Sequence, residues 1–206
     1  MRSVFSSLAM VVALSVTANV AKSDGPVTYK VLDQGAAQLR EDFNAAKGSV
    51  RVLFVVDPIC PGCLRGLDDV NKDLLSKTND PRLQAFVVHV PVLTPPPSAK
   101  DVPEAATLLR NDHVHHYWNP SGSFGEELSA AVGLKHGDEP VYAWDVWLIY
   151  GPEATWEAAS PPRPQRLMHQ LYLLKDSTEF PRLNSRVFAQ EVHQLLTQIP
   201  EVHQVQ

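Results

Sequence analysis

Residues 50–63, VRVLFVVDPICPGC, decide how this chain folds. The run 50–56 is nearly all apolar and rich in β-branched residues, which predicts a strand buried on both faces at the centre of a sheet. Asp57-Pro58 interrupts that run, and Cys60-Pro61-Gly62-Cys63 follows. Residues 64–77 then place Leu and Val on one helical stripe. The sequence therefore predicts a Cys-x-x-Cys motif at the junction of a buried strand and a helix.

That junction predicts different chemistry for the two cysteines. A thiol at the start of a helix faces unpaired backbone N–H groups and the positive end of the helix dipole, which stabilise a thiolate. Because the thiolate is the nucleophile, we expect Cys60 to attack and Cys63, one turn along, to resolve a mixed disulfide. Pro61 suits the first helical turn, since its missing N–H would be unpaired there. Gly62 adds little bulk, so a substrate backbone can approach.

The rest of the chain alternates between strand and helix patterns. Such alternation implies βαβ units, so we expect an α/β fold with a largely parallel sheet. Residues 91–139 begin with a Pro-rich loop that leaves the sheet, and we expect them to be an insertion because they are too short for their own core. The expected strands are 28–32, 50–56, 83–90 and 140–150, and the expected helices are 36–46, 64–77, 104–109, 124–132, 165–174 and 185–199.

The first residues have the pattern of an export signal. Arg2 precedes a short apolar run at residues 8–16, and small residues follow it. A charged start, a short apolar core and a small-residue exit are typical of a secretory signal peptide. The run is shorter than the roughly 18–20 apolar residues that a spanning helix needs. We therefore expect a signal peptide at 1–23, a single domain at 24–206, and a periplasmic or secreted product.

Composition favours a globular domain, which we expect to be a monomer. The chain has 206 residues, of which 44% are hydrophobic and 20% charged, so it can bury a core. Its net charge of -5 is opposite to the basic footprint of nucleic-acid binding, so we expect no nucleic-acid partner. The chain has 2 cysteines. Because a bridge between them would close a very small loop and stabilise little, the pair is interpreted as reactive rather than structural.

Residues 55–63, VVDPICPGC, resemble the active-site segment of thioredoxin-fold disulfide oxidoreductases. The Asp-Pro-x-Cys-Pro-x-Cys pattern is closest to the periplasmic Dsb branch, and the resemblance covers about residues 50–90 plus the general order of elements. It implies a thioredoxin-like fold, with a central mixed sheet flanked by helices, in which Cys60 is the exposed nucleophile and Cys63 the buried resolving thiol. The implied partners are thiols or disulfides of exported proteins and a membrane-bound redox protein, and no cofactor is implied.

The sequence departs from that family in two places. Isomerase-type members carry an N-terminal dimerisation domain, and the residues before 50 leave no room for one after the expected signal. Thioredoxin-like folds also place a cis-proline opposite the Cys pair, and Pro140 after Glu139 is our preferred candidate. The alternative is that Trp144-Asp145-Val146 occupies that place and no cis-proline exists.

Two further groups of side chains carry open alternatives. Asp57 is either a proton shuttle for the thiols or, as we favour, a strand-end residue bonded to local N–H groups. His113, His115 and His116 are weak metal candidates, alone or with the Cys pair, because zinc and copper bind imidazole and thiolate. The leading hypothesis is thus thiol–disulfide exchange at Cys60 and Cys63. The alternative is a metal-binding or redox-silent partner-binding protein of the same fold.

Overall fold

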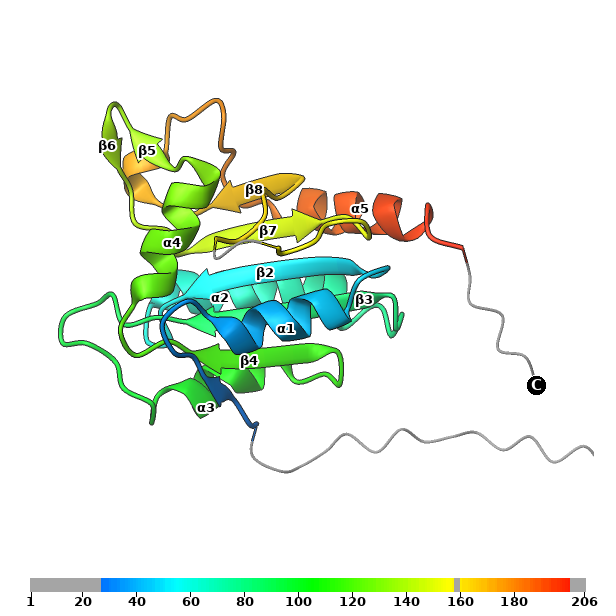
Figure 1. Cartoon of the computed structure of the whole chain (residues 1–206), viewed down its shortest axis with the longest axis horizontal. Helices are drawn as coiled ribbons and strands as arrows, with labels where there is room; N and C mark the ends of the chain where they lie inside the picture. Colours follow the sequence, from blue (N-terminus) through cyan, green and yellow to red (C-terminus); the bar gives the residue numbers. More distant parts are fainter. Residues whose placement is uncertain (1–26, 158–159, 201–206) are drawn as a thin grey trace, which may run out of the picture.

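The computed structural model describes residues 27–157 and 160–200. Within them, a six-stranded sheet of order β1-β4-β3-β2-β7-β8 carries helices on both faces (Figure 1). The strands are β1 Lys30–Val31, β2 Val50–Val56, β3 Leu83–His89, β4 Val114–Trp118, β7 Val146–Tyr150 and β8 Arg166–His169, with a separate hairpin of β5 Lys135–His136 and β6 Glu139–Pro140. The α-helices are α1 Ala37–Ala45, α2 Pro61–Val70, α3 Val102–Ala106, α4 Ser123–Val132 and α5 Ser185–Leu196. Shorter helical turns are a π-helix at Asn71–Leu75 and 3-10 helices at Thr107–Leu109 and Tyr172–Leu174.

Strand β2 lies inside the sheet, between a parallel and an antiparallel neighbour. It pairs in parallel with β3 from Val50↔Leu83 to Val56↔His89, and antiparallel with β7 on its other side. The β2-α2-β3 segment is therefore a βαβ unit, and the antiparallel pair β7-β8 followed by α5 completes the arrangement. The fold is thioredoxin-like, with the mixed central sheet that the resemblance implies.

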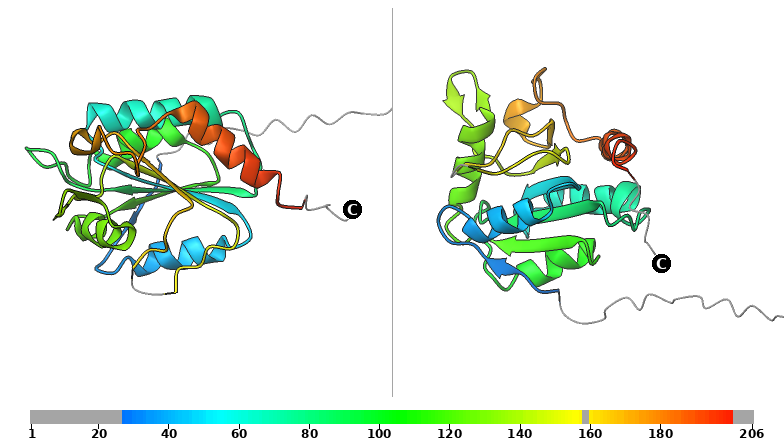
Figure 2. Two further views of the ribbon diagram at one scale, coloured as in Figure 1. Left: turned by 90° about the horizontal axis from the view of Figure 1, so that it is seen from above. Right: turned by 45° about the vertical axis from the view of Figure 1, so that its right-hand side comes forward.

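The alternation of side chains along β2 fills both layers of the core. Leu53 and Val55 face a cluster that includes α1 and α4, whereas Val52, Phe54 and Val56 face a cluster that includes α2 and α5. Figure 2 shows these two helical layers on opposite sides of the sheet. All seven residues of β2 are buried, so the strand that ends at the Cys pair has both of its faces covered by helices.

Residues 165–174 were expected to be helical, and that prediction is wrong. They form β8, which pairs with β7 from Val146↔His169 to Ile149↔Arg166, and then a 3-10 turn. Leu167 belongs to one core cluster and Met168 to the other, so successive side chains point to opposite faces of the sheet. Pairing with a distant strand has overridden the local helical spacing.

The strand expected at 140–150 is shorter than predicted. Residues 139–140 belong to β6, where Glu139 pairs with His136 and Pro140 with Lys135. The central strand β7 starts only at Val146. Residues 141–145 therefore connect the small hairpin to β7 and bring the chain next to the start of α2.

Residues 91–139 leave the sheet after β3 and return to it. Within this segment, β4 pairs in parallel with β3 from Ala85↔Val114 to His89↔Trp118, and β1 pairs with its outer side. The segment expected as an insertion thus supplies a strand between β1 and β3.

The expected signal peptide at 1–23 lies outside the described residues. In residues 27–157 and 160–200, no helix is both long enough and apolar enough to cross a membrane.

Candidate active site

Cys60 is the N-cap of α2, and Cys63 lies in the first turn. The Cys60 sulfur accepts a hydrogen bond from the Cys63 backbone N–H at 3.4 Å. Pro61 is the first residue of the helix. Cys60 and Cys63 are not joined by a disulfide in this structure. Cys60 is 8% exposed and Cys63 is 0% exposed, so a partner reaches Cys60 first.

The two thiols have opposite acidities. The pKa of Cys60 is lowered to about 6, mainly because the Cys63 thiol donates a hydrogen bond to its sulfur, with the backbone N–H groups of Cys63 and Gly62 adding to the effect. The pKa of Cys63 is raised, because its thiol is the donor to Cys60 and is buried beside Asp145. At neutral pH the site therefore holds a Cys60 thiolate above a protonated Cys63.

Asp145 is the acidic residue at this site. It precedes β7, has a φ of 50°, and is 5% exposed. One carboxylate oxygen and the sulfurs of Cys60 and Cys63 all lie within 4.8 Å of one another. Burial raises the pKa of Asp145 to about 6, against hydrogen bonds from Trp147 and Cys63 that lower it. A carboxyl group with this pKa can accept or return a proton near neutral pH.

The Asp145 carboxylate is fixed by Trp147 on β7 and by Gln170, which directly follows β8. The Trp147 indole Nε1 donates to Oδ1 at 3.3 Å. The Gln170 side chain, with its amide nitrogen turned towards the site, donates to the same oxygen at 2.9 Å and to the Gly62 carbonyl at 3.3 Å. The Gln170 backbone N–H also donates to the Asp145 carbonyl at 3.0 Å. Gln170 therefore joins Asp145 to the start of α2, a role that nothing in its sequence context indicates.

The expectation of a cis-proline at Pro140 is wrong. Pro140 is exposed in β6 and pairs with Lys135 in the small hairpin. In the part of the chain that the structure describes, the cis peptide bond is Thr94–Pro95. Opposite the Cys pair stands Asp145, within the segment named as the alternative. The reason is geometric: β7 begins at Val146, so the residue that enters it beside α2 is Asp145.

Asp57 has the structural position that the sequence favoured. Its Oδ1 accepts the Ile59 N–H at 2.9 Å, and its Oδ2 accepts the N–H groups of Val92 and Leu93, both at 2.8 Å. The carboxylate thus ties the end of β2 to the segment after β3. Its hydrogen bonds hold backbone amides in place, and the carboxylate that lies beside both sulfurs is that of Asp145.

The three candidate histidines do not converge. His113 and His115 both contact the Gln84 side chain, at 3.3 and 3.1 Å. His116 points to the other face of β4, where its ring lies 3.3 Å from His89 and 3.3 Å from the Leu109 carbonyl oxygen. Among the described residues, the group that can hold a metal ion is Cys60, Cys63 and Asp145.

Comparison with known proteins gives structural similarity at low sequence identity. No family model and no curated protein matches the chain. A secreted Mycobacterium tuberculosis disulfide oxidoreductase homologous to Escherichia coli DsbE has a TM-score of 0.45 at 10% identity, over 73% of this chain and 85% of that one. A thiol:disulfide interchange protein of the thioredoxin family from Chlorobium tepidum has a TM-score of 0.44 at 11% identity, over 74% and 83%. A yeast mitochondrial 1-Cys peroxiredoxin has a TM-score of 0.46 at 11% identity, over 79% and 73%.

Proposed function

We propose that this chain is an exported thiol–disulfide oxidoreductase that works through Cys60-Pro61-Gly62-Cys63. The observation that carries the proposal is the pairing of a thiol of lowered pKa at the N-cap of α2 with a buried second thiol one turn away. A low-pKa, partly accessible thiolate next to a resolving cysteine is the arrangement that disulfide exchange requires.

The reaction begins at the thiolate of Cys60. It attacks one sulfur of a substrate disulfide, forms a mixed disulfide, and releases the other substrate sulfur as a thiolate. Cys63 then loses its proton to the Asp145 carboxylate and attacks the Cys60 sulfur. This step breaks the mixed disulfide, releases the substrate as a dithiol, and leaves a Cys60–Cys63 disulfide. The substrate gains the two electrons that the protein loses, and the reverse sequence oxidises a dithiol.

The proposed setting is the periplasm or the exterior of the cell. The signal-like pattern at 1–23 supports it, and disulfides in exported proteins persist there. The partners we propose are thiols or disulfides of exported proteins and a membrane-bound protein that restores the Cys60–Cys63 pair, with the chain acting as a monomer.

Reduction of insulin disulfides by the dithiol-charged chain tests the proposed function. We expect turnover by the wild-type chain and its loss in both Cys60→Ser and Cys63→Ser, because a full cycle needs two sulfurs. The exposed variant Asp69→Asn is a matched control and keeps wild-type turnover. A Cys60→Ser chain that still turned over insulin would overturn the proposal.

A further inference from the structure

Three side chains that can each carry a negative charge face one another at the N-terminal end of α2. Cys60, Cys63 and Asp145 come from the N-cap and first turn of α2 and from the entry to β7, and all three are buried. Buried groups of like charge are stable only when they are neutralised, paired or bound to a cation. Arg65 and Arg182 also act on this carboxylate and lower its pKa, so the site combines three anionic donors with two nearby arginines.

Two of the hydrogen bonds to the Asp145 carboxylate fall on the same oxygen. Trp147 and Gln170 both donate to Oδ1 of Asp145. Oδ2 points towards the motif: it lies 3.6 Å from the place where a β-carbon on Gly62 would stand, and the Cys60 sulfur lies 3.7 Å from the same place. Because residue 62 has no side chain, no β-carbon stands between this oxygen and this sulfur, and Arg65 Nη2 lies 4.0 Å from the same place.

The donor set favours a particular kind of ion. Two thiolates exclude hard cations such as magnesium and calcium, while a carboxylate oxygen is a poor ligand for copper(I). Zinc accepts both, with Zn–S bonds of about 2.3 Å and Zn–O bonds of about 2.0–2.2 Å. Donor atoms that all lie within 4.8 Å of one another can meet one such ion. Three protein ligands also leave the fourth tetrahedral position open.

We propose that Cys60, Cys63 and Asp145 bind one zinc ion when the cysteines are reduced, with the fourth ligand position open to water or to an incoming thiolate. The ion bonds to both sulfurs and to a carboxylate oxygen, and the thiol proton of Cys63 leaves to solvent. No oxidation state changes. Zinc and the intramolecular disulfide are then mutually exclusive states of the same two sulfurs, so the bound ion protects the reduced pair. The exchange reaction proposed above uses the same sulfurs but needs no ion, so the two proposals can fail separately.

The test is an anaerobic titration of the reduced full chain with Co²⁺, followed by displacement with Zn²⁺ in competition with a chromophoric chelator. We expect one ion per chain and a thiolate-to-cobalt charge-transfer band. Asp145→Asn should weaken zinc binding at least about tenfold, since loss of even an outer-shell partner costs roughly 10–100-fold. Asparagine keeps the shape of the side chain and tolerates the positive φ at this position. Cys63→Ser and the oxidised chain should lack the charge-transfer band.

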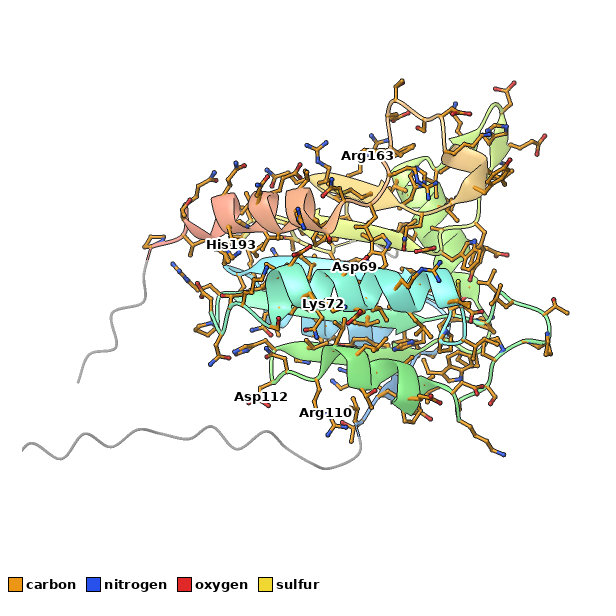
Figure 3. The ribbon with its side chains drawn as sticks, turned by 180° about the vertical axis from the view of Figure 1, so that it is seen from behind. Asp69, Lys72, Arg110, Asp112, Arg163 and His193 are labelled. Atoms are coloured by element: carbon orange, nitrogen blue, oxygen red, sulfur yellow. The ribbon has the colours of Figure 1, made fainter. Side chains whose placement is uncertain are left out.

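The matched control is Asp69→Asn, which removes the same charge from the outward side of α2 (Figure 3). It should bind zinc within about twofold of the wild-type chain. The proposal is overturned if Asp145→Asn binds zinc as tightly as the wild-type chain does, or if the reduced chain gives no charge-transfer band. Insulin reduction measured with excess chelator separates the two proposals, because it reports exchange without the ion.

Discussion

At the scale of single residues, Cys60 and Asp145 influence each other's charge. The nearby carboxylate raises the pKa of Cys60, against the larger lowering by the Cys63 thiol and two backbone N–H groups. In the metal-free reduced chain, the rate of Cys60 alkylation should therefore rise through a midpoint near pH 6. Asp145→Asn removes the negative charge and should move that midpoint to lower pH. Alkylation followed by mass spectrometry, in chelator, measures both midpoints, and a midpoint near that of a free thiol would contradict the assignment.

Asp57 provides a second residue-scale prediction, because its two oxygens hold three backbone N–H groups. Asp57→Asn keeps the shape but replaces one acceptor oxygen with a donor group. We expect a loss of about 1–3 kcal/mol in the free energy of unfolding, since a buried N–H is left without an acceptor. Urea denaturation measures this loss. If Asp57 were the proton acceptor, the same variant would instead slow the resolution of mixed disulfides while leaving stability unchanged.

At the scale of elements, the close packing of α2 against the sheet depends on Gly66. A β-carbon at this position would lie 2.4 Å from Trp147 Cζ2 and 2.5 Å from the Gln170 side-chain amide. Both neighbours support Asp145, so a larger residue would push α2 away from the site. Gly66→Ala should reduce the free energy of unfolding by roughly 1–3 kcal/mol, although alanine is the better helix former.

The control for Gly66→Ala is Asp69→Ala, which gives the same new residue on the exposed side of α2 and should be neutral or slightly stabilising. Urea denaturation of both variants decides the matter. A Gly66→Ala chain that is more stable than the wild type would show that the contact between α2 and Trp147 is not tight.

Elements whose signal is local were predictable, and those fixed by distant pairing were not. Residues 50–63 carry their own pattern of a buried run, a break and a proline-started helix, and the structure has β2 and α2 there. Residues 165–174 have helical spacing, yet β8 forms because β7 offers a free edge. The approach of Asp145 to the thiols depends on where β7 begins and on Gln170, which lie far from the motif in sequence. Spacing along the chain does not contain that information.

At the scale of the whole molecule, stability depends on buried histidines. His89 Nε2 lies 3.3 Å from His116 Nδ1, and both side chains are buried. Burial lowers the pKa of His89 to about 3 and that of His116 to about 4. Both stay neutral in the folded chain, while the unfolded chain protonates them below about pH 6.5. Their contribution to stability is therefore complete above pH 6.5 and is lost as the pH falls through their folded-state pKa values of about 4 and about 3.

Asp145 works in the opposite direction, because its pKa is raised by folding to about 6. Cys60, whose pKa is lowered by folding to about 6, acts in the same direction as the two histidines. Together these three groups outweigh one carboxyl group, so the free energy of unfolding should fall by roughly 3 kcal/mol between pH 7 and 5.5. Urea denaturation across this range measures the slope. His193→Gln changes an exposed histidine (Figure 3) and should keep the slope, whereas His89→Leu should reduce it. A flat profile in the wild type would contradict the neutral state of the buried pair.

The central claim is that Cys60 attacks and Cys63 resolves, and trapping of mixed disulfides tests it most directly. Cys63→Ser, mixed with an oxidised protein substrate in the presence of chelator, should accumulate a covalent adduct through Cys60, because no second thiol remains to release it. Cys60→Ser should accumulate none, since Cys63 is buried and its pKa is raised. Non-reducing electrophoresis and peptide mapping measure both outcomes. An adduct formed through Cys63 in the Cys60→Ser chain, with none in Cys63→Ser, would contradict the account.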